Sequence, residues 1–369
     1  MQILFYVFLA AAGIQSIYFL IFIIAFSRKR SVPEHQFPPV SIVVAAHDEE
    51  ENLRQLLPIL MAQDYPSFEI IIVEDRSNDE SYDFLLAETK QNSNIKMVRV
   101  QQTPNHINSK KFALTLGIKA AKNEWILFCD ADCRPVSEQW IQSMSVYFQE
   151  PTKIVLGYSP YTTSPGWLNR FIRFDTIITA VQYLGFALVR KPYMGIGRNL
   201  AYRKSLFLDN KGFNEVNHVV GGDDDLFVNK HANQTNVSVA LGSSTIVETI
   251  PKTTWSDFFR QKLRHLSVGK LYKPSHKFIL GFFTLSWILV WMLGVLQLFT
   301  LDLPLIIGII GGILVVRVIL LTATIQITVK ALGDRFEVWP IVFLDILYPF
   351  YYITTGLAAL FTKKVQWRN

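Results

Sequence analysis

Two carboxylates spaced one residue apart, Asp130 and Asp132, follow a short apolar run that starts at Trp125. Such a run between polar residues predicts a buried strand, which would place both carboxylates at its carboxyl end. Acids this close repel each other unless a cation lies beside them, and Mg²⁺ or Mn²⁺ binds oxygen ligands while taking further ligands from phosphates. The pair therefore indicates either a site for a divalent cation and a diphosphate or an ordinary solvated turn.

Acidic residues also follow two earlier apolar runs. Glu49 comes after the run at residues 40–46, and Asp75 comes after the run at residues 69–73. Both runs are rich in β-branched residues, which predicts strands, and a helical pattern follows each of them. Alternating strands and helices predict a parallel sheet, and open α/β folds bind ligands at the carboxyl edge of such a sheet. We therefore expect three acidic clusters to meet at one edge, although Glu49 and Asp75 could equally cap helices.

The remaining elements continue this α/β pattern. Further strands are expected at 96–100 and 154–158, and helices at 53–61, 80–90, 112–121, 139–148 and 255–272. A polar loop before residue 112 contains Lys110 and Lys111, which either reach a phosphate or are solvated. Residues 168–189 form an amphipathic segment that either packs on the core or lies at a membrane surface.

A second acidic cluster follows two glycines and opens a helix. It consists of Asp223, Asp224 and Asp225. One aspartate is sufficient to cap a helix, so the cluster holds more acids than capping requires. The additional carboxylates are therefore candidates for chemistry.

The composition indicates a membrane protein. The chain has 369 residues, 50% of them hydrophobic, and the apolar excess lies at its two ends. Residues 3–26 carry no charge and are long enough to span a bilayer, and the basic residues 28–30 that follow place that side in the cytoplasm. The net charge of +6 suits a surface near anionic lipids and gives no reason to expect nucleic acid as a partner.

Three apolar segments near the C-terminus complete this pattern, at residues 278–300, 303–329 and 338–361. If all three span, the basic tail after residue 362 ends outside, which the positive-inside rule disfavours. The last segment is the first candidate for a re-entrant or interfacial helix, because Asp345 and Pro349 are costly in lipid.

The cysteines flank the acidic pair. Cys129 and Cys133 could form a disulfide, bind a metal or pack in the core. Disulfides are rare in the cytoplasm, and two cysteines without a nearby histidine make a poor zinc site. We expect reduced structural thiols.

Taken in order, five segments resemble the motifs of inverting family 2 glycosyltransferases, which have a GT-A fold. They are the first strand with its acidic loop at 40–52, Glu74-Asp75-Arg76-Ser77, Asp130-Ala131-Asp132, Gly222-Asp223-Asp224-Asp225-Leu226 and Gln261-Lys262-Leu263-Arg264-His265. The last segment is similar to a Gln-x-x-Arg-Trp motif of polysaccharide synthases, with His265 in place of Trp. The resemblance covers about residues 39–272 and implies a Rossmann-like, mostly parallel sheet flanked by transmembrane helices.

The resemblance assigns donor-side roles. Asp132, assisted by Asp130, would hold a Mg²⁺ or Mn²⁺ ion that offsets charge on the leaving diphosphate. Arg264 would contact the diphosphate from the other side, and Lys110 would reach the phosphates.

Further resemblances concern the nucleotide and the acceptor. Glu49 and Asp75 resemble residues that bind the nucleotide base and ribose. Asp223 would be the general base for the acceptor hydroxyl, and attack in line with the leaving group would invert the anomeric centre. The acceptor or donor side would also include the residues Gln261, His265 and Asp224.

The sequence thus predicts a metal-dependent enzyme of the cytoplasmic membrane face, in a bacterial inner membrane. It would transfer a sugar from a UDP- or GDP-linked donor to a lipid-linked or polysaccharide acceptor, adding one sugar per binding event. We expect an anchor at 1–30, a catalytic domain at 38–275 and a membrane region at 276–369. The alternatives are a sugar transferase to polyprenyl phosphate and a non-catalytic scaffold or transport protein with a GT-A domain.

Overall fold

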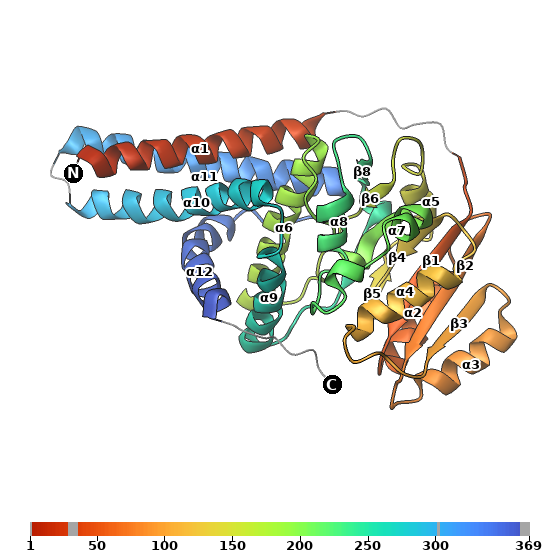
Figure 1. Cartoon of the computed structure of the whole chain (residues 1–369). Helices are drawn as coiled ribbons and strands as arrows, with labels where there is room; N and C mark the ends of the chain where they lie inside the picture. Colours follow the sequence, from red (N-terminus) through yellow and green to blue (C-terminus); the bar gives the residue numbers. More distant parts are fainter. Residues whose placement is uncertain (1, 29–35, 301–302, 362–369) are drawn as a thin grey trace. The chain divides into compact units, whose positions relative to one another are not determined.

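The computed structural model describes residues 2–28, 36–300 and 303–361 (Figure 1). Two of the three basic residues at 28–30, the first half of the segment 32–39, which its prolines predict to be a linker, and the basic C-terminal tail lie outside these ranges. The chain divides into two compact units. The sheet unit comprises Arg30–Thr162 and Phe186–Pro251, and the helical unit comprises Met1–Lys29, Thr163–Gly185 and Lys252–Asn369.

The sheet unit is built on a seven-stranded sheet in the order β3-β2-β1-β4-β7-β6-β8. Its strands are β1 (Val40–Ala46), β2 (Phe68–Asp75), β3 (Ile95–Val100), β4 (Trp125–Phe128), β6 (Ile154–Leu156), β7 (Leu200–Arg203) and β8 (Val237–Val239). The first four strands in this order are parallel, whereas β7 is antiparallel to both of its neighbours. A separate pair joins β5 (Cys133–Pro135) to β9 (Val247–Thr249). The predicted α/β fold with a mostly parallel sheet is confirmed.

The helices of this unit connect the strands. They are α2 (Glu50–Met61), α3 (Ser81–Gln91), α4 (Ser109–Ala120), α5 (Trp140–Ser145), α7 (Lys204–Asp209) and α8 (Asp225–His231), with the 3₁₀ turns η1 (Gly197–Asn199), η2 (Asn214–Val216) and η3 (Ser243–Thr245). Some predicted elements were too long, because α5 ends before residue 148, β6 ends before residue 158 and the helix predicted at 255–272 ends at residue 269.

The start of α4 corrects one prediction about the site. The helix begins at Ser109 because the side chain of Asn108 accepts a hydrogen bond from the Lys111 amide and caps the first turn. Lys110 and Lys111 therefore lie in the first turn of a helix, and the prediction that they belong to a polar loop was wrong.

Close packing fixes α4 against the sheet. A Cβ atom added at Gly117 would lie 2.7 Å from Cγ1 of Val43 and 2.8 Å from Cγ2 of Val73, on β1 and β2. Only a glycine lets the helix axis approach the strands this closely. On the opposite face of the sheet, away from α4, the core includes the fully buried residues Val40, Ile42, Val44, Ile70, Ile72 and Leu127.

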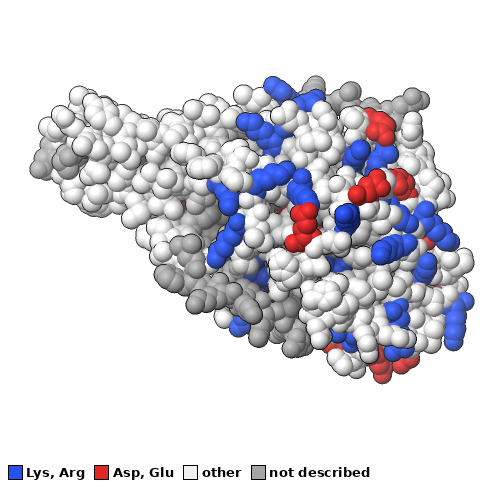
Figure 2. All heavy atoms as spheres, in the orientation of Figure 1, with Lys and Arg blue, Asp and Glu red and all other residues white. Residues whose placement is uncertain are grey.

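The helical unit contains α1 (Gln2–Ser27), α6 (Trp167–Leu188), α9 (Trp255–Gly269), α10 (Pro274–Thr300), α11 (Pro304–Leu332) and α12 (Ile341–Phe361). The part of α6 that belongs to this unit ends at Gly185. Helices α1, α10 and α11 pack along one another (Figure 1). Among the described residues, five of these helices (all but α9) are long and apolar enough to cross a membrane. Figure 2 shows no charged side chain on the N-terminal end of α1 in that view.

Helix α6 answers the question left open for the amphipathic segment. The most apolar window of α6 is 78% buried within the protein. Phe171 of this helix contacts Phe258 of α9 and Tyr351 of α12, with the ring centroids 5.8 and 5.1 Å apart. Helix α6 is therefore a packed helix of its unit.

The charges within α11 and α12 are paired. Arg317 of α11 donates from Nη1 to Asp345 of α12 and from Nε to Oε1 of Gln15 of α1, the latter at 2.6 Å. Both charged side chains are buried. Since Asp345 has a cationic partner, its presence no longer argues against a spanning α12, which continues through Pro349 as one helix.

We predict that Gly117→Ala destabilises the sheet unit by about 1–3 kcal/mol, because the new methyl group overpacks the contact between α4 and the strands. Thermal unfolding followed by circular dichroism would measure the effect. Gly281→Ala in α10 is a suitable control, since its Cβ would meet nothing within 4 Å and alanine favours helix. An unchanged unfolding midpoint for the Gly117 variant would contradict the proposed packing.

Candidate active site

The carboxyl ends of β2, β1 and β4 are adjacent, because β1 lies between the other two strands. Glu49 follows β1 and precedes α2. Its side chain does not cap α2 but accepts a hydrogen bond from Nδ2 of Asn52 at 2.6 Å. Burial raises the pKa of Glu49, against the opposite effect of the Asn52 bond, and the charges of Asp132 and Asp130 raise it further. The acids after β1 and β4 therefore act on one another, as expected.

Asp75 is the last residue of β2 and is buried. Its Oδ1 accepts a hydrogen bond from Nε of Arg76 at 2.9 Å, and its carbonyl oxygen lies 2.6 Å from Nδ1 of His47. Asp75 is thus a strand residue at the sheet edge, and the alternative that it caps a helix was wrong.

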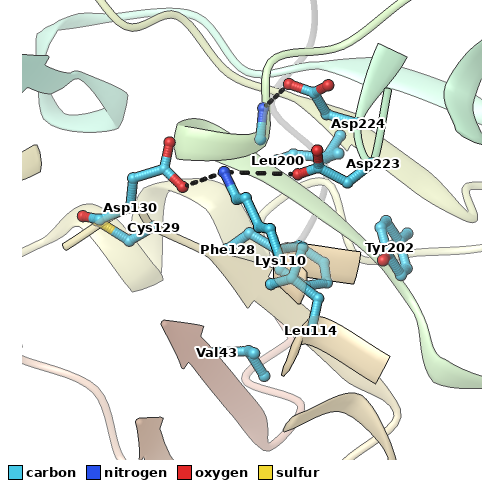
Figure 3. Close-up of a pocket in the computed structure, with 11 residues that line it drawn as sticks. Val43, Lys110, Leu114, Phe128, Cys129, Asp130, Leu200, Tyr202, Asp223 and Asp224 are labelled. Atoms are coloured by element: carbon cyan, nitrogen blue, oxygen red, sulfur yellow. Dashed lines mark hydrogen bonds and ion pairs between the residues drawn. The ribbon is translucent and has the colours of Figure 1, made fainter. Parts of the chain in front are cut away.

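The Lys110 ammonium links two acidic clusters (Figure 3). Its Nζ lies 2.9 Å from Oδ1 of Asp130 and 3.5 Å from Oδ2 of Asp223. Burial lowers the pKa of Lys110, but the two carboxylates outweigh burial and hold this pKa above its usual value. A charge from the start of α4 therefore joins the acid after β4 to the acid before α8.

Two neighbouring residues of the second acidic cluster, Asp223 and Asp224, have different partners. Asp224 precedes α8 and accepts hydrogen bonds on both oxygens, from the amide of Gly197 at 2.6 Å and from the amide of Asp225 at 2.7 Å. Asp223, one residue earlier, has its Oδ2 3.5 Å from Nζ of Lys110. Asp224 is therefore held by backbone amides, whereas Asp223 contacts a side chain.

Burial and the charge of Asp223 raise the pKa of Asp224 to about 6, against the opposing effects of Lys110 and the two amides. The two neighbouring aspartates thus differ in environment.

These groups surround a small pocket within the sheet unit (Figure 3). Its lining residues are Val43, Lys110, Leu114, Phe128, Cys129, Asp130, Gly197, Leu200, Tyr202, Asp223 and Asp224. Apolar residues of β1, β4, β7 and α4 form the floor, and the charged residues stand together above it (Figure 3).

The residues after β4 fit a divalent cation. Asp130, Asp132 and Cys133 offer ligand atoms that all lie within 4.8 Å of one another. Asp132 is exposed and its Oδ1 accepts only a weak bond from the Cys133 thiol at 3.4 Å, whereas Asp130 is engaged by Lys110. Two carboxylates suit Mg²⁺ or Mn²⁺ better than a thiol does.

Both cysteines are free and buried in the core, so the expectation of reduced structural thiols is confirmed. Burial and the neighbouring carboxylates Asp130 and Asp132 raise the pKa of each thiol well above its usual value. The thiols are therefore protonated and serve packing.

The predicted residues Gln261, Arg264 and His265 lie on α9, in the helical unit. Their spacing of three and four residues places them on one face of the helix. Gln261 and Arg264 are partly exposed, and His265 is exposed.

One contributor to the site was missed in the sequence. The Gly197 amide belongs to η1 and holds Asp224, and a Cβ at this position would lie 3.3 Å from Oδ2 of Asp224. The two glycines at 195 and 197 were the available signal, because glycine permits close approach of a backbone to another group.

Comparison with known proteins identifies the family. The profile of glycosyl transferase family 21 matches residues 5–369. The chain belongs to this family. The motifs had suggested family 2, so the family number differs, while the predicted class of enzyme, a glycosyltransferase, is confirmed.

Individual relatives agree with this family. The probable glycosyltransferase YdaM of Bacillus subtilis is 26% identical over 278 residues, which cover 70% of this chain and 62% of YdaM. The UDP-Glc:alpha-D-GlcNAc-diphosphoundecaprenol beta-1,3-glucosyltransferase WfaP of Escherichia coli is 27% identical over 38% of this chain and 50% of WfaP. The matches thus cover less than two thirds of the length of either relative.

A solved structure shares the fold. The mannosyltransferase PcManGT from Pyrobaculum calidifontis, in complex with GDP-Man and Mn²⁺, superposes with a TM-score of 0.64 at 14% identity. The superposition covers 98% of this chain and 100% of that one. The family 21 chain therefore has the fold of a known glycosyltransferase along its length.

We predict that Asp224→Asn flattens the pH dependence of stability between about pH 4 and 6. The raised pKa means that the folded protein binds more protons than the unfolded chain in this window, so the free energy of unfolding falls as the pH rises. The variant should lose this slope, which in the wild type lowers the free energy of unfolding by about 1–3 kcal/mol in total across the window. Thermal unfolding midpoints across this pH range would measure it.

The exposed Asp209→Asn is the matched control and should keep the slope of the wild type. An unchanged slope for the Asp224 variant would show that Asp224 does not titrate in this window.

Proposed function

We propose that this family 21 protein transfers a sugar from a UDP- or GDP-linked donor to a lipid-linked or polysaccharide acceptor, with inversion. The observation that carries the proposal is the Lys110 ammonium within 3.5 Å of both Asp130 and Asp223. The carboxylate of the cation site and the candidate base thus face one pocket from two sides. Inverting sugar transfer requires this arrangement, because the leaving group and the acceptor lie on opposite faces of the anomeric carbon.

The cation would be held by Asp132 with the assistance of Asp130. When bound, a divalent cation stabilises the negative charge that gathers on the leaving diphosphate. The Mn²⁺ complex of the mannosyltransferase with the same fold supports a cation here.

Two basic side chains are proposed to bind phosphate. Lys110 is already placed beside Asp130, where a phosphate next to the cation would come within reach. Arg264 on α9 would bind phosphate oxygens, since a guanidinium matches them with two parallel hydrogen bonds. Gln261 and His265, on the same helix face, would contact the acceptor or the donor sugar.

Asp223 is the proposed general base. Both oxygens of Asp224 are occupied by backbone amides, which leaves Asp223 as the carboxylate that can accept a proton from an acceptor hydroxyl. Attack opposite the leaving group would convert an α-linked donor into a β-linked product. The beta-linked product named for WfaP is consistent with this outcome.

Glu49 and Asp75 would bind the nucleoside. Both lie at the carboxyl edge of the parallel strands, next to the acids after β4. Asp75 is buried and fixed by Arg76, so it offers a pre-oriented acceptor for a ribose hydroxyl or a base.

A membrane location supports a lipid-linked acceptor. Segments 1–30 and 276–369 would anchor the protein in a bacterial inner membrane, with the segment 38–275 facing the cytoplasm. The apolar helices α1, α10, α11 and α12 support this location, and WfaP takes an acceptor whose printed name includes diphosphoundecaprenol. The poly-beta-1,6-N-acetyl-D-glucosamine synthase of Staphylococcus epidermidis, 33% identical over 27% of this chain, supports a growing glycan as the other candidate acceptor.

We predict that Asp223→Asn lowers kcat by about 10²–10⁴-fold, because the amide cannot accept the acceptor proton. Donor affinity should change little, since Asp223 is placed on the acceptor side. Release of UDP or GDP from a panel of nucleotide sugars, measured with purified protein and lipid-linked acceptors, gives the rate. The exposed Asp64→Asn is the control. Wild-type rates in the Asp223 variant would exclude Asp223 as the base, and a wild type inactive with every donor would indicate a scaffold.

We predict that Asp132→Ala weakens Mn²⁺ binding at least about tenfold, because it removes the exposed carboxylate of the cation site. Calorimetric titration with Mn²⁺ measures this without requiring turnover. Cys133→Ser should retain the affinity if carboxylates are the ligands. A loss of affinity in the serine variant, with Asp132→Ala unaffected, would transfer the role to the thiol.

A further inference from the structure

We propose that Lys111 is a positioning residue that holds the turn before Asp223, and this inference rests on the proposed role of Asp223 as the base. Lys111 is completely buried, with 0% of its surface exposed. Its Nζ donates to the carbonyl oxygens of Val216 at 2.8 Å, Val219 at 2.7 Å and Gly221 at 2.5 Å. A lysine ammonium has three protons, so all of its donors are used within the protein.

These contacts explain why a buried ammonium is tolerated. A charge without partners in the interior is costly, whereas three carbonyl oxygens satisfy every N–H bond. Burial lowers the pKa of Lys111, and the charges of Asp223, Asp225 and Asp224 oppose this effect. The side chain is therefore engaged with the backbone and is not available to a phosphate, unlike its neighbour Lys110.

The segment that Lys111 holds is a turn with unusual backbone geometry. Gly221 and Gly222 both have φ of +78°, a region that favours glycine. Since neither residue has a side chain to fix the turn, its position depends on contacts made by its carbonyl groups. A second link comes from the amide of Asn108, which donates to the carbonyl oxygen of Asn217 at 2.7 Å. The first turn of α4 and its cap thus anchor residues 216–221.

Lys110 and Lys111 therefore both help to position Asp223, each through different partners. Lys110 contacts the carboxylates of Asp130 and Asp223, and Lys111 contacts the backbone that leads to Asp223. Helix α4 is itself fixed on the sheet at Gly117. The position of the base relative to the acids after β4 is consequently set by one helix terminus.

Lys204 of α7 is a matched lysine, because it contacts the backbone at the other end of α4. Lys204 donates from Nζ to the carbonyl oxygen of Ala121 at 2.6 Å, directly after the C-terminus of α4. It makes the same type of contact but does not touch the turn before Asp223. Lys204→Met therefore controls for the loss of a lysine that binds backbone carbonyls.

The test compares Lys111→Met, Lys111→Gln and Lys204→Met as full-length proteins. In Lys111→Met we expect kcat to fall about 100-fold, because a displacement of about 1 Å in a catalytic group has this effect. The KM for the donor should stay within about twofold of the wild type, since donor contacts are retained. Lys111→Gln keeps two N–H donors and should lose about tenfold, while Lys204→Met should keep kcat.

Hydrogen exchange provides a readout that does not depend on turnover. Amides in residues 216–222 should exchange faster in Lys111→Met, while those of β1 keep their protection. Unchanged kcat in a folded Lys111→Met, a uniform rise in exchange across the sheet unit, or an equal loss in Lys204→Met would each overturn the proposal. If the wild type transfers no sugar, the proposed function fails, and unchanged exchange at 216–222 would separately overturn the anchoring by Lys111.

Discussion

The site depends on how negative charge is balanced at one edge of the sheet. Carboxylates gather there because parallel strands end together, and like charges at such distances repel. The ammonium of Lys110 offsets this repulsion by bridging Asp130 and Asp223, which belong to segments almost a hundred residues apart in the chain. A cation and a diphosphate would bring additional charges of both signs to this edge of the sheet.

The sheet could be predicted well from the sequence, because its pattern is local. The bounds of β1 were predicted to the residue. The strand that ends at Asp75 and the strand that precedes Asp130 were found from short runs of β-branched and apolar residues. The start of α4 was missed although Asn108 is a favoured capping residue, since the polar residues around it were taken for a loop.

The contacts within the site were harder to predict, because they join distant parts of the chain. Lys111 meets Val216 across 105 positions, and nothing in the local pattern distinguishes a solvated lysine from a buried one. The hydrogen bond from the Gly197 amide to Asp224 could not be predicted from the sequence for another reason. Every residue other than proline has a backbone N–H donor, so which amide binds Asp224 depends on the fold alone. The acids themselves were recognised because their number exceeded what capping explains.

The pairing of Arg317 with Asp345 has a consequence for how the protein is made. An unpaired charge in an apolar helix opposes entry into a bilayer, by about 2.5–3.5 kcal/mol where it lies near the middle of the helix, as Arg317 does in α11. In the folded chain each charge is matched by the other, and Gln15 of α1 accepts a further bond from Arg317. In a membrane, α11 and α12 would therefore enter as a hairpin rather than one after the other. Helix α1, synthesised first, would already be in place to receive them, so the order of synthesis matches the order in which partners are needed.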